Sequence, residues 1–183
     1  FNLGNMYKDG EGVPEDNKEA VKWFRLAADQ GDADAQFNLG NMYKDGRGVP
    51  KDDKEAVKWY RLAANQGNAD AQSNLGSMYA DGRGVIEDDK AAMKWYRLAA
   101  EQGLAGGQYN LGFMYGTGEG VTKDYKETMK WYRLAADQGH AKARSMIAVL
   151  YARGFGTEIN FAKAVEYDAE NANRETINHV YTL

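Results

Sequence analysis

The hydrophobic residues of this chain fall on two helical stripes that alternate along its length. In one stretch the apolar residues stand at i, i+4, i+7 and i+8: Ala35, Leu39, Met42 and Tyr43. In the next stretch they follow the same periodicity over a wider face: Ala56, Val57, Tyr60, Ala63 and Ala64, widened by Trp59 and Leu62. We therefore expect a first helix over about residues 33–44 and a second over about residues 53–66.

This pair of stripes repeats every 36 residues without an insertion. The run FNLGNMY at Phe1 returns at Phe37, Ser73 and Tyr109, and in a fainter form at Ser145. Residues 1–36 and 37–72 are identical at 30 of 36 positions. A helix pair this small cannot bury its apolar stripe alone, but stacked neighbours can. The sequence therefore predicts an all-α fold, an α-solenoid in the form of a right-handed superhelix of about five 36-residue antiparallel helical hairpins.

Polar residues and glycines mark the ends of the second helix in each copy. One column just before it holds the expected N-cap residues: Asp16, Asp52, Asp88, Asp124 and Asn160. Glu19, Glu55 and Glu127 follow three residues later, which is the capping-box spacing. Another column, just after the helix, holds a glycine where a left-handed residue is needed: Gly31, Gly67, Gly103 and Gly139.

The repeat array is predicted to span residues 1–173, with repeats at about 1–31, 32–67, 68–103, 104–139 and 140–173. Phe1 aligns with Phe37 in the middle of a first helix, so we expect the first repeat to be truncated. The fifth copy departs from the others, with Tyr167 in place of tryptophan, as terminal repeats often do. Residues 174–183 are expected to form a capping helix or tail.

The loop between the two helices carries two glycines, one residue apart, in every copy: Gly10/Gly12, Gly46/Gly48, Gly82/Gly84, Gly118/Gly120 and Gly154/Gly156. Glycine pairs also occur in phosphate-binding turns and in calcium loops. A phosphate turn opens a helix and continues with Lys-Ser/Thr or a third glycine, and a calcium loop has oxygen ligands at alternate positions. This loop has neither feature. We interpret its glycines as the end of the first helix and a tight turn.

Composition and residue spacing exclude several classes of function. The net charge of −4 gives no electrostatic reason to expect binding of nucleic acid, which needs a basic face, and no apolar run is long enough to span a membrane. Without cysteines there is no disulfide or thiolate chemistry, and His140 and His179 are too far apart in sequence to suggest a metal site. The tryptophans stand at one position of the second helix, which favours a core role over an aromatic cage: Trp23, Trp59, Trp95 and Trp131. We therefore expect no catalytic residues, no metal and no cofactor.

These columns together resemble the Sel1-like repeat, a relative of the tetratricopeptide repeat. The resemblance is carried by Ala35-x3-Leu39-Gly40-x2-Tyr43-x2-Gly46-x-Gly48-Val49, followed by Asp52-x3-Ala56-x2-Trp59-x3-Ala63-Ala64-x2-Gly67. It recurs with few departures through about residue 139. The resemblance implies an adaptor or scaffold that binds a protein or peptide in a concave groove lined by the first helix of each repeat.

A helical step of 100° per residue puts Phe37, Asn41 and Lys44 opposite the apolar stripe of the first helix. We call this surface, with its equivalents in the other repeats, the first-helix face. Asparagines recur beside it: Asn2, Asn38, Asn74 and Asn110. The resemblance implies that they grip a peptide backbone, since an asparagine has one acceptor and two donors to match a peptide group. The alternative is that they are solvated or bonded within their own helix.

Structural columns stay fixed between copies, whereas columns of the first-helix face drift. In the early copies this face is mostly polar and charged, and in the later copies it becomes aromatic and apolar. The candidate binding positions are Phe37, Asn41, Lys44, Ser77, Tyr109, Phe113 and Val149. We expect the aromatic residues Tyr109 and Phe113 to anchor a partner.

The expected protein is a monomer that binds a protein or peptide, with self-association through exposed end repeats as an alternative. Two other roles stay open: a structural spacer, and a module associated with carbohydrate or the cell envelope. Hydrolase activity, proposed for some cysteine-rich relatives, is disfavoured because the chain has no cysteine and no recognisable catalytic set. The resemblance favours a bacterial periplasmic or secreted location over a cytoplasmic one.

Overall fold

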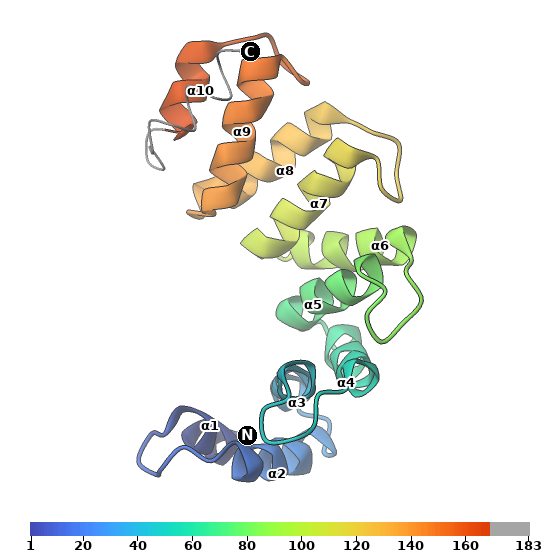
Figure 1. Cartoon of the computed structure of the whole chain (residues 1–183), viewed down its shortest axis with the longest axis vertical. Coiled ribbons are helices and arrows are strands. Elements are labelled where there is room, and N and C mark those ends of the chain that lie inside the picture. The colour runs from blue at the N-terminus through green and yellow to red at the C-terminus, as the bar shows by residue number, and fades with distance from the viewer. Residues whose placement is uncertain (169–183) are drawn as a thin grey trace. The chain divides into compact units, whose positions relative to one another are not determined.

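The computed structural model describes residues 1–168, and every regular element in that part of the chain is an α-helix (Figure 1). The helices are α1 (Asn2–Asp9), α2 (Asn17–Ala28), α3 (Ala33–Asp45), α4 (Asp53–Asn65), α5 (Ala69–Ala80), α6 (Asp89–Glu101), α7 (Ala105–Thr117), α8 (Tyr125–Asp137), α9 (Ala141–Arg153) and α10 (Phe161–Asp168). Odd-numbered helices are the first helices of the repeats and even-numbered ones the second. The predicted fold class, an all-α array of helical hairpins, is confirmed. The expected capping helix at 174–183 lies outside the described residues.

Contacts divide the chain into two compact units, Phe1–Trp95 and Tyr96–Leu183. Unit 1 holds α1 to α5 and the first part of α6, and unit 2 holds the rest of α6 and α7 to α10. We describe each unit by itself. Within each unit, consecutive helices pack against one another, as in α3 with α4 and α7 with α8.

The second helices begin at the predicted N-caps. The Asp52 carboxylate accepts hydrogen bonds from the backbone N–H groups of Lys54 and Glu55, at 2.9 and 3.0 Å, and Asp16 and Asp124 do the same in their copies. The reciprocal bond of a capping box, from the Asp52 N–H to the Glu55 carboxylate, is not formed. The Asp52 N–H donates to the carbonyl of Tyr43 at 3.0 Å, so it needs no bond from Glu55, whose carboxylate pairs with Lys58 instead.

The two loop glycines have different tasks. Gly46 ends α3 in the left-handed conformation, with φ of 71°, and its N–H donates to the carbonyl of Met42. Gly48 has φ of 72° and lies against the preceding repeat, where an added Cβ would be 2.1 Å from the carbonyl oxygen of Asn17. The bend interpretation is therefore confirmed, and the second glycine also allows neighbouring hairpins to approach closely.

The core of unit 1 lies between neighbouring hairpins. Trp59 packs into the cluster that α2 and α3 form, with Phe24 and Leu39 among its members, so this tryptophan belongs to the core between its own repeat and the preceding one. The same position in the first copy, Trp23, is 37% exposed. Leu62 was expected to widen the apolar face, but it is 43% exposed. It stands beyond the edge of the stripe that the next hairpin covers.

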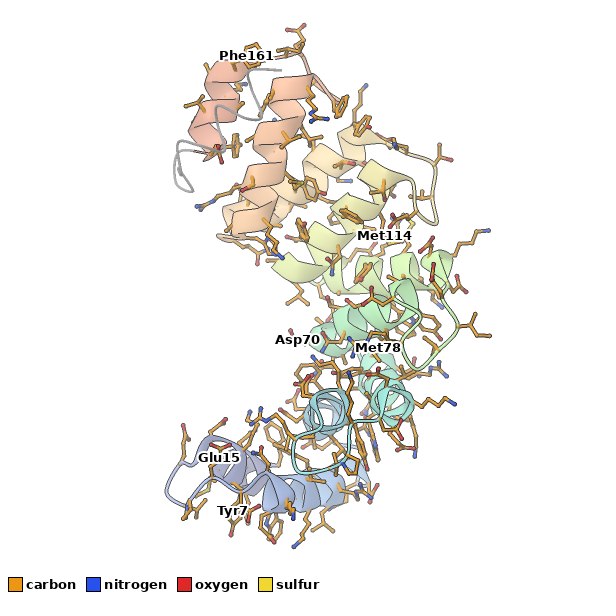
Figure 2. The ribbon with its side chains drawn as sticks, in the orientation of Figure 1. Tyr7, Glu15, Asp70, Met78, Met114 and Phe161 are labelled. Carbon is orange, nitrogen blue, oxygen red and sulfur yellow. The ribbon has the colours of Figure 1, made fainter. Side chains whose placement is uncertain are left out.

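Unit 2 repeats this arrangement with its own residues. Its core cluster joins α8, α9 and α10, with Tyr132, Ile147 and Ala164 among the buried members. Met78 of α5 and Met114 of α7 stand at the same repeat position in the two units, and both are buried (Figure 2). The buried core positions of the repeat are therefore filled in the same way in the two units, and the units differ in the residues around the core.

Candidate functional site

On the first-helix face of unit 1, three polar side chains meet. The Tyr60 hydroxyl, from α4, donates to Asn41 Oδ1 of α3 at 2.7 Å, and Asn74 Nδ2 of α5 donates to the same oxygen at 3.3 Å. Phe37 covers the Tyr60 ring, with ring centroids 6.1 Å apart. We call Tyr60, Asn41 and Asn74 the amide cluster.

Tyr60 is a buried residue with a polar tip, which explains its place in this cluster. Its side chain is fully covered and belongs to the core formed by α4 and α5. Burial raises its pKa, and the neighbouring Asn74 amide acts in the opposite direction. The hydroxyl therefore remains protonated at any physiological pH and needs an acceptor, which Asn41 provides.

The other predicted residues of unit 1 have local partners or none. Asn38 Nδ2 donates to the backbone carbonyl of Asp34 at 2.8 Å, so this asparagine is bonded within its own helix. The Lys44 ammonium lies 3.6 Å from the Asp45 carboxylate, and the Ser77 hydroxyl donates to the Ser73 carbonyl. Asn2 is exposed at the start of α1.

On the first-helix face of unit 2, three rings form a stack. Tyr109 of α7 lies between Tyr132 of α8 and His140 at the start of α9, with centroid distances of 5.5 and 4.7 Å. Tyr109 is half-buried, so its ring is part of the packing of unit 2. Burial raises the pKa of Tyr132, as it does for Tyr60.

His140 also serves as the N-cap of α9. Its Nδ1 accepts the backbone N–H of Ala143 at 3.2 Å, in the position that Asp32 and Asn68 fill in earlier repeats. Burial lowers the pKa of His140, its own backbone hydrogen bond acts in the opposite direction, and the charge of Lys142 lowers the pKa further. The neutral form is therefore the one that the fold favours.

The remaining predicted residues of unit 2 lie on α7 and α9. Phe113 is 42% exposed. Val149 and Asn110 are half-buried, and Asn110 has no hydrogen-bond partner for its side chain among residues 1–168. The structure thus brings Tyr109 into a ring stack and leaves Phe113 accessible.

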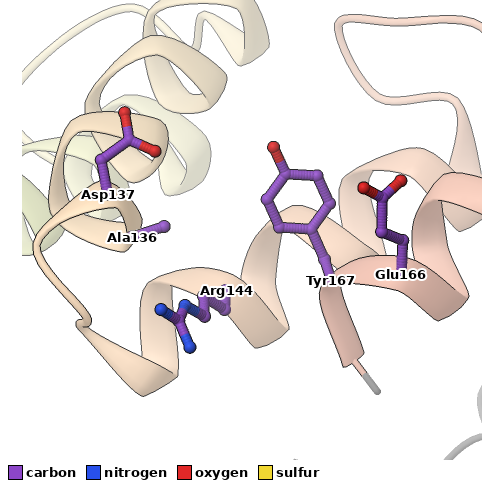
Figure 3. A pocket seen from close by; sticks show the side chains of 5 residues that line it. All are labelled: Ala136, Asp137, Arg144, Glu166 and Tyr167. Atoms are coloured by element: carbon purple, nitrogen blue, oxygen red, sulfur yellow. The ribbon is translucent and has the colours of Figure 1, made fainter. Parts of the chain in front are cut away.

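A cavity of about 400 Å³ lies between α8, α9 and α10 (Figure 3). It is lined by Ala136, Asp137, Arg144, Glu166 and Tyr167. Arg144 holds the position that glutamine fills in three earlier repeats. The lining can hydrogen-bond a polar group, but the five described lining residues offer no nucleophile with an adjacent base, as acyl or phosphoryl transfer would need.

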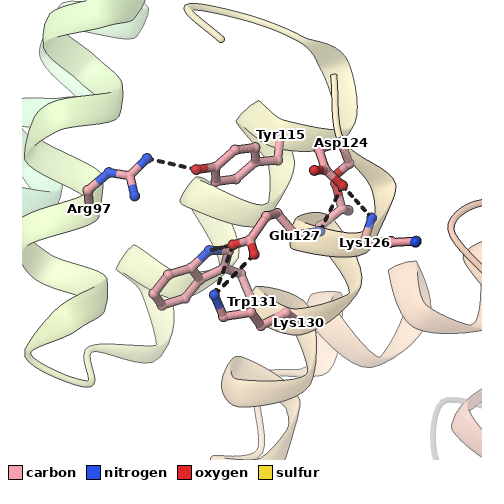
Figure 4. A network of polar contacts seen from close by, with 8 residues as sticks. Arg97, Tyr115, Asp124, Lys126, Glu127, Lys130 and Trp131 are labelled. Carbon is pink, nitrogen blue, oxygen red and sulfur yellow. Dashed lines mark hydrogen bonds and ion pairs between the residues drawn. The ribbon is translucent and has the colours of Figure 1, made fainter. Parts of the chain in front are cut away.

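Figure 4 shows polar contacts that the second helices of unit 2 make. In α8, Glu127 accepts from Lys130 at 3.0 Å and from the Trp131 ring N–H, also at 3.0 Å. Arg97 donates to the Tyr115 hydroxyl at 2.7 Å. The Glu127 contacts lie within α8 and the Arg97 contact joins α6 to α7, and none of them assembles a reactive centre.

Sequence reasoning missed two repeated polar contacts. One glutamine column is buried, and its amides donate to backbone carbonyls of the preceding second helix: Gln36, Gln72 and Gln108. An arginine column donates to tyrosine hydroxyls 18 residues on: Arg25–Tyr43, Arg61–Tyr79, Arg97–Tyr115 and Arg133–Tyr151. The signal was present, because the same polar residue recurs at these positions in successive copies: glutamine in three and arginine in four.

Residues 1–168 contain no group of three or more histidine, cysteine, aspartate or glutamate side chains that could hold a metal ion. None of the helices within that range combines the length and apolar character needed to cross a membrane.

Comparison with known proteins gives a consistent result. The family model of the Sel1 repeat matches residues 1–32, 33–68, 69–104, 105–140 and 141–167. No curated protein sequence matches the chain.

Among solved structures, the chain is similar to a Sel1 repeat protein from Oxalobacter formigenes, with 37% identity and a TM-score of 0.89 over 98% of this chain and 72% of that one. It is also similar to c5321, a protective antigen of uropathogenic Escherichia coli with an SLR fold, with 38% identity and a TM-score of 0.90 over 98% of this chain. The chain spans only 40% of that antigen. Cysteine rich protein B of Helicobacter pylori, at 21% identity and a TM-score of 0.57 over 72% of this chain and 95% of that one, shares the fold alone.

Proposed function

Because the chain belongs to the Sel1 repeat family, we propose that it is an adaptor that binds a protein or peptide segment on its first-helix face. Sel1 repeat proteins are generally scaffolds for protein interaction and not enzymes. The finer statement, that the first-helix face is the binding surface and that the partner presents a peptide segment, is our proposal.

The exposure of Phe113 carries this proposal. Its column holds Asn41 and Ser77 in the two preceding repeats, so the aromatic ring is not required by the repeat fold. An accessible aromatic side chain on a rigid helix is a typical anchor at protein interfaces, because its burial gives a large gain for little lost conformational freedom. Half-buried Val149, on the next first helix, stands in the same column.

The test compares Phe113→Ala with a matched control on the other side of the hairpin, Leu134→Ala. Leu134 lies on α8 of the same unit and is 41% exposed, against 42% for Phe113. Peptides would be selected from a random display library on the unmodified protein, and their affinities measured for both variants. We expect Phe113→Ala to weaken binding by about tenfold or more and Leu134→Ala to leave it unchanged.

Two results would contradict the proposal. A larger loss for Leu134→Ala would place the partner on the second helices. Failure of the unmodified protein to select any peptide would favour the role of a structural spacer. Circular dichroism of both variants checks that the fold is intact.

A further inference from the structure

We propose that the loop between α5 and α6 carries a self-association site, at which two copies of this chain pair through Ile86. Each copy inserts its Ile86 side chain into a crevice beside the same loop of the other copy. The site lies on unit 1, away from the first-helix face, and does not depend on the proposed function.

Ile86 is the most exposed large hydrophobic residue in the described part of the chain. It is 90% exposed in the loop that joins α5 to α6 (Figure 1). The repeat fold does not require an apolar residue there, because the same column holds Pro14, Pro50, Thr122 and Glu158 in the other copies. An exposed aliphatic side chain contributes free energy only when another surface covers it.

An apolar crevice of about 310 Å³ lies directly beside this side chain. Its lining residues are Lys54, Gly82, Gly84, Val85 and Ile86. The two glycines add no side chain to the space, and Val85 packs on the core cluster that α4 and α5 form. The crevice therefore rests on the core of unit 1 and has room for one aliphatic side chain.

The position of Ile86 at the edge of the crevice determines how two copies meet. When Ile86 of one copy enters the crevice of another, the second copy's Ile86 is brought to the crevice of the first. Both contacts then form at once about a two-fold axis, as in an isologous dimer. A head-to-tail arrangement would make only one of these contacts for each pair of copies.

The charges at this site favour a second copy as the occupant. Glu87 follows Ile86 directly and is exposed, and exposed Lys54 stands at the crevice. Within residues 1–168, neither the Glu87 carboxylate nor the Lys54 ammonium has a hydrogen-bond or ion-pair partner. Insertion of Ile86 brings Glu87 towards Lys54 of the other copy, and this pairing sets the register of the contact more than its strength.

The contact is small, so the dimer belongs to the weak and transient class of interfaces. Sedimentation equilibrium with up to about 1 mM protein is therefore the suitable measurement. The unmodified protein should show a monomer–dimer equilibrium without larger species. A monomer at every concentration would overturn the inference.

Ile86→Pro removes the inserted side chain and should keep the fold. Proline stands at this position in the first two copies, and the Ile86 N–H makes no hydrogen bond within residues 1–168. We expect the variant to weaken self-association about tenfold or more, because the substitution alters both contacts of the dimer. Unchanged self-association would place the contact elsewhere and overturn the inference.

Ile159→Lys is the matched control for loss of an exposed isoleucine. Ile159 is 60% exposed in the loop before α10, and its column holds lysine in the second and fourth copies. The variant should self-associate as the unmodified protein does. An equal loss for both isoleucine variants would contradict a specific role for Ile86.

Charge reversal tests whether the two copies pair as inferred. Lys54→Glu and Glu87→Lys should each weaken self-association about threefold to tenfold, because each sets like charges against one another. A mixture of the two variants should recover the original affinity, since opposite charges meet again at both contacts of the mixed dimer. Lys90→Glu makes the same change of net charge at the equivalent position of α6 and should have no effect. A mixture that does not recover would overturn the two-fold arrangement.

Discussion

Tyr60 in unit 1 and Tyr132 in unit 2 stand at the same repeat position, yet they do different things. Both rings are buried, and burial raises the pKa of both hydroxyls. Tyr60 directs its hydroxyl to Asn41, whereas Tyr132 stacks on Tyr109 and has no hydrogen-bond partner for its hydroxyl in the described part of the chain. A tyrosine at one position of the repeat therefore makes different contacts in the two units, because the residues around it differ.

The inter-repeat loop contacts vary in the same way. In unit 1, Arg83 of the loop lies 2.9 Å from the Asp53 carboxylate of the preceding second helix. The equivalent positions in unit 2 are Phe155 and Tyr125, whose rings stack with centroids 4.6 Å apart. Ionic and aromatic pairs therefore support the same contact between hairpins, and this freedom allows copies to diverge without losing the stack.

The contact that should not tolerate change is the one made by the second loop glycine. In Gly84→Ala the new Cβ would lie 2.2 Å from the Asp53 carbonyl oxygen, at a φ of 69°. Strain and overpacking together should lower the free energy of unfolding by about 2–5 kcal/mol in urea titrations. Gly156→Ala in unit 2, with a contact of 2.6 Å, should cost somewhat less.

Gly12→Ala is the control for this prediction. Its φ is 75°, but the nearest atom to a new Cβ is Met6 Cε at 3.5 Å. Only the backbone strain of about 1–2 kcal/mol should remain. Equal losses for Gly12→Ala and Gly84→Ala would show that close approach of neighbouring hairpins is not what the second glycine provides.

The next largest difference in stability is expected between phenylalanine variants of the two buried tryptophans, Trp59 and Trp131. Trp131 Nε1 donates to Glu127 at 3.0 Å, whereas Trp59 Nε1 is buried without a partner. Trp131→Phe loses packing and a hydrogen bond, while Trp59→Phe loses packing but removes an unsatisfied donor. We expect Trp131→Phe to be more destabilising by about 1–2 kcal/mol in the same titration. The reverse order would mean that packing differences outweigh the polar ones.

A smaller difference in stability is expected between the phenylalanine variants of Tyr60 and Tyr132. Tyr60→Phe removes a hydroxyl that bonds to Asn41, and Tyr132→Phe removes one without such a bond. The first should lower the free energy of unfolding by about 0.5–1.5 kcal/mol, and the second should change it little. Thermal unfolding followed by circular dichroism measures both. A loss of similar size for Tyr132→Phe would refute the distinction between the units.

The smallest effect should be a pH dependence located in unit 2. The folded-state pKa of His140 is lowered by burial, so the unfolded chain binds the proton first as the pH falls. The contribution of His140 to stability is therefore complete above its ordinary pKa of about 6.5 and is lost as the pH drops below that value. Protonation also removes the acceptor that caps α9.

His140→Asn tests this effect, because Asn68 caps α5 in the same way without titrating. Melting temperatures of both proteins would be compared on either side of the His140 transition. The unmodified protein should lose more stability on acidification than the variant. Parallel curves for the two proteins would rule out a role for His140.

Much of this protein could be predicted from its sequence, because the repeat shows each position in five copies and separates constant positions from variable ones. Helix bounds, N-caps such as Asp52 and the bend at Gly46 and Gly48 follow from local backbone chemistry, which the chain encodes within a few residues. For the candidate site, the sequence predicted the first-helix face but not the contacts between its side chains. Asn38 and Asn74 occupy one column and have the same residue type, but one bonds within its helix and the other to Asn41.

The sequence by itself therefore determined the helices, their caps, the hairpin repeat and the family to which the chain belongs. Only the tertiary structure decided which polar side chains meet, since Tyr60, Asn41 and Asn74 come from three helices and their contact depends on how successive hairpins stack. It also decided the exposure of Leu62, which a periodic pattern assigned to the core. Periodicity gives the direction of a side chain from its helix, and the neighbouring hairpin determines whether anything covers it.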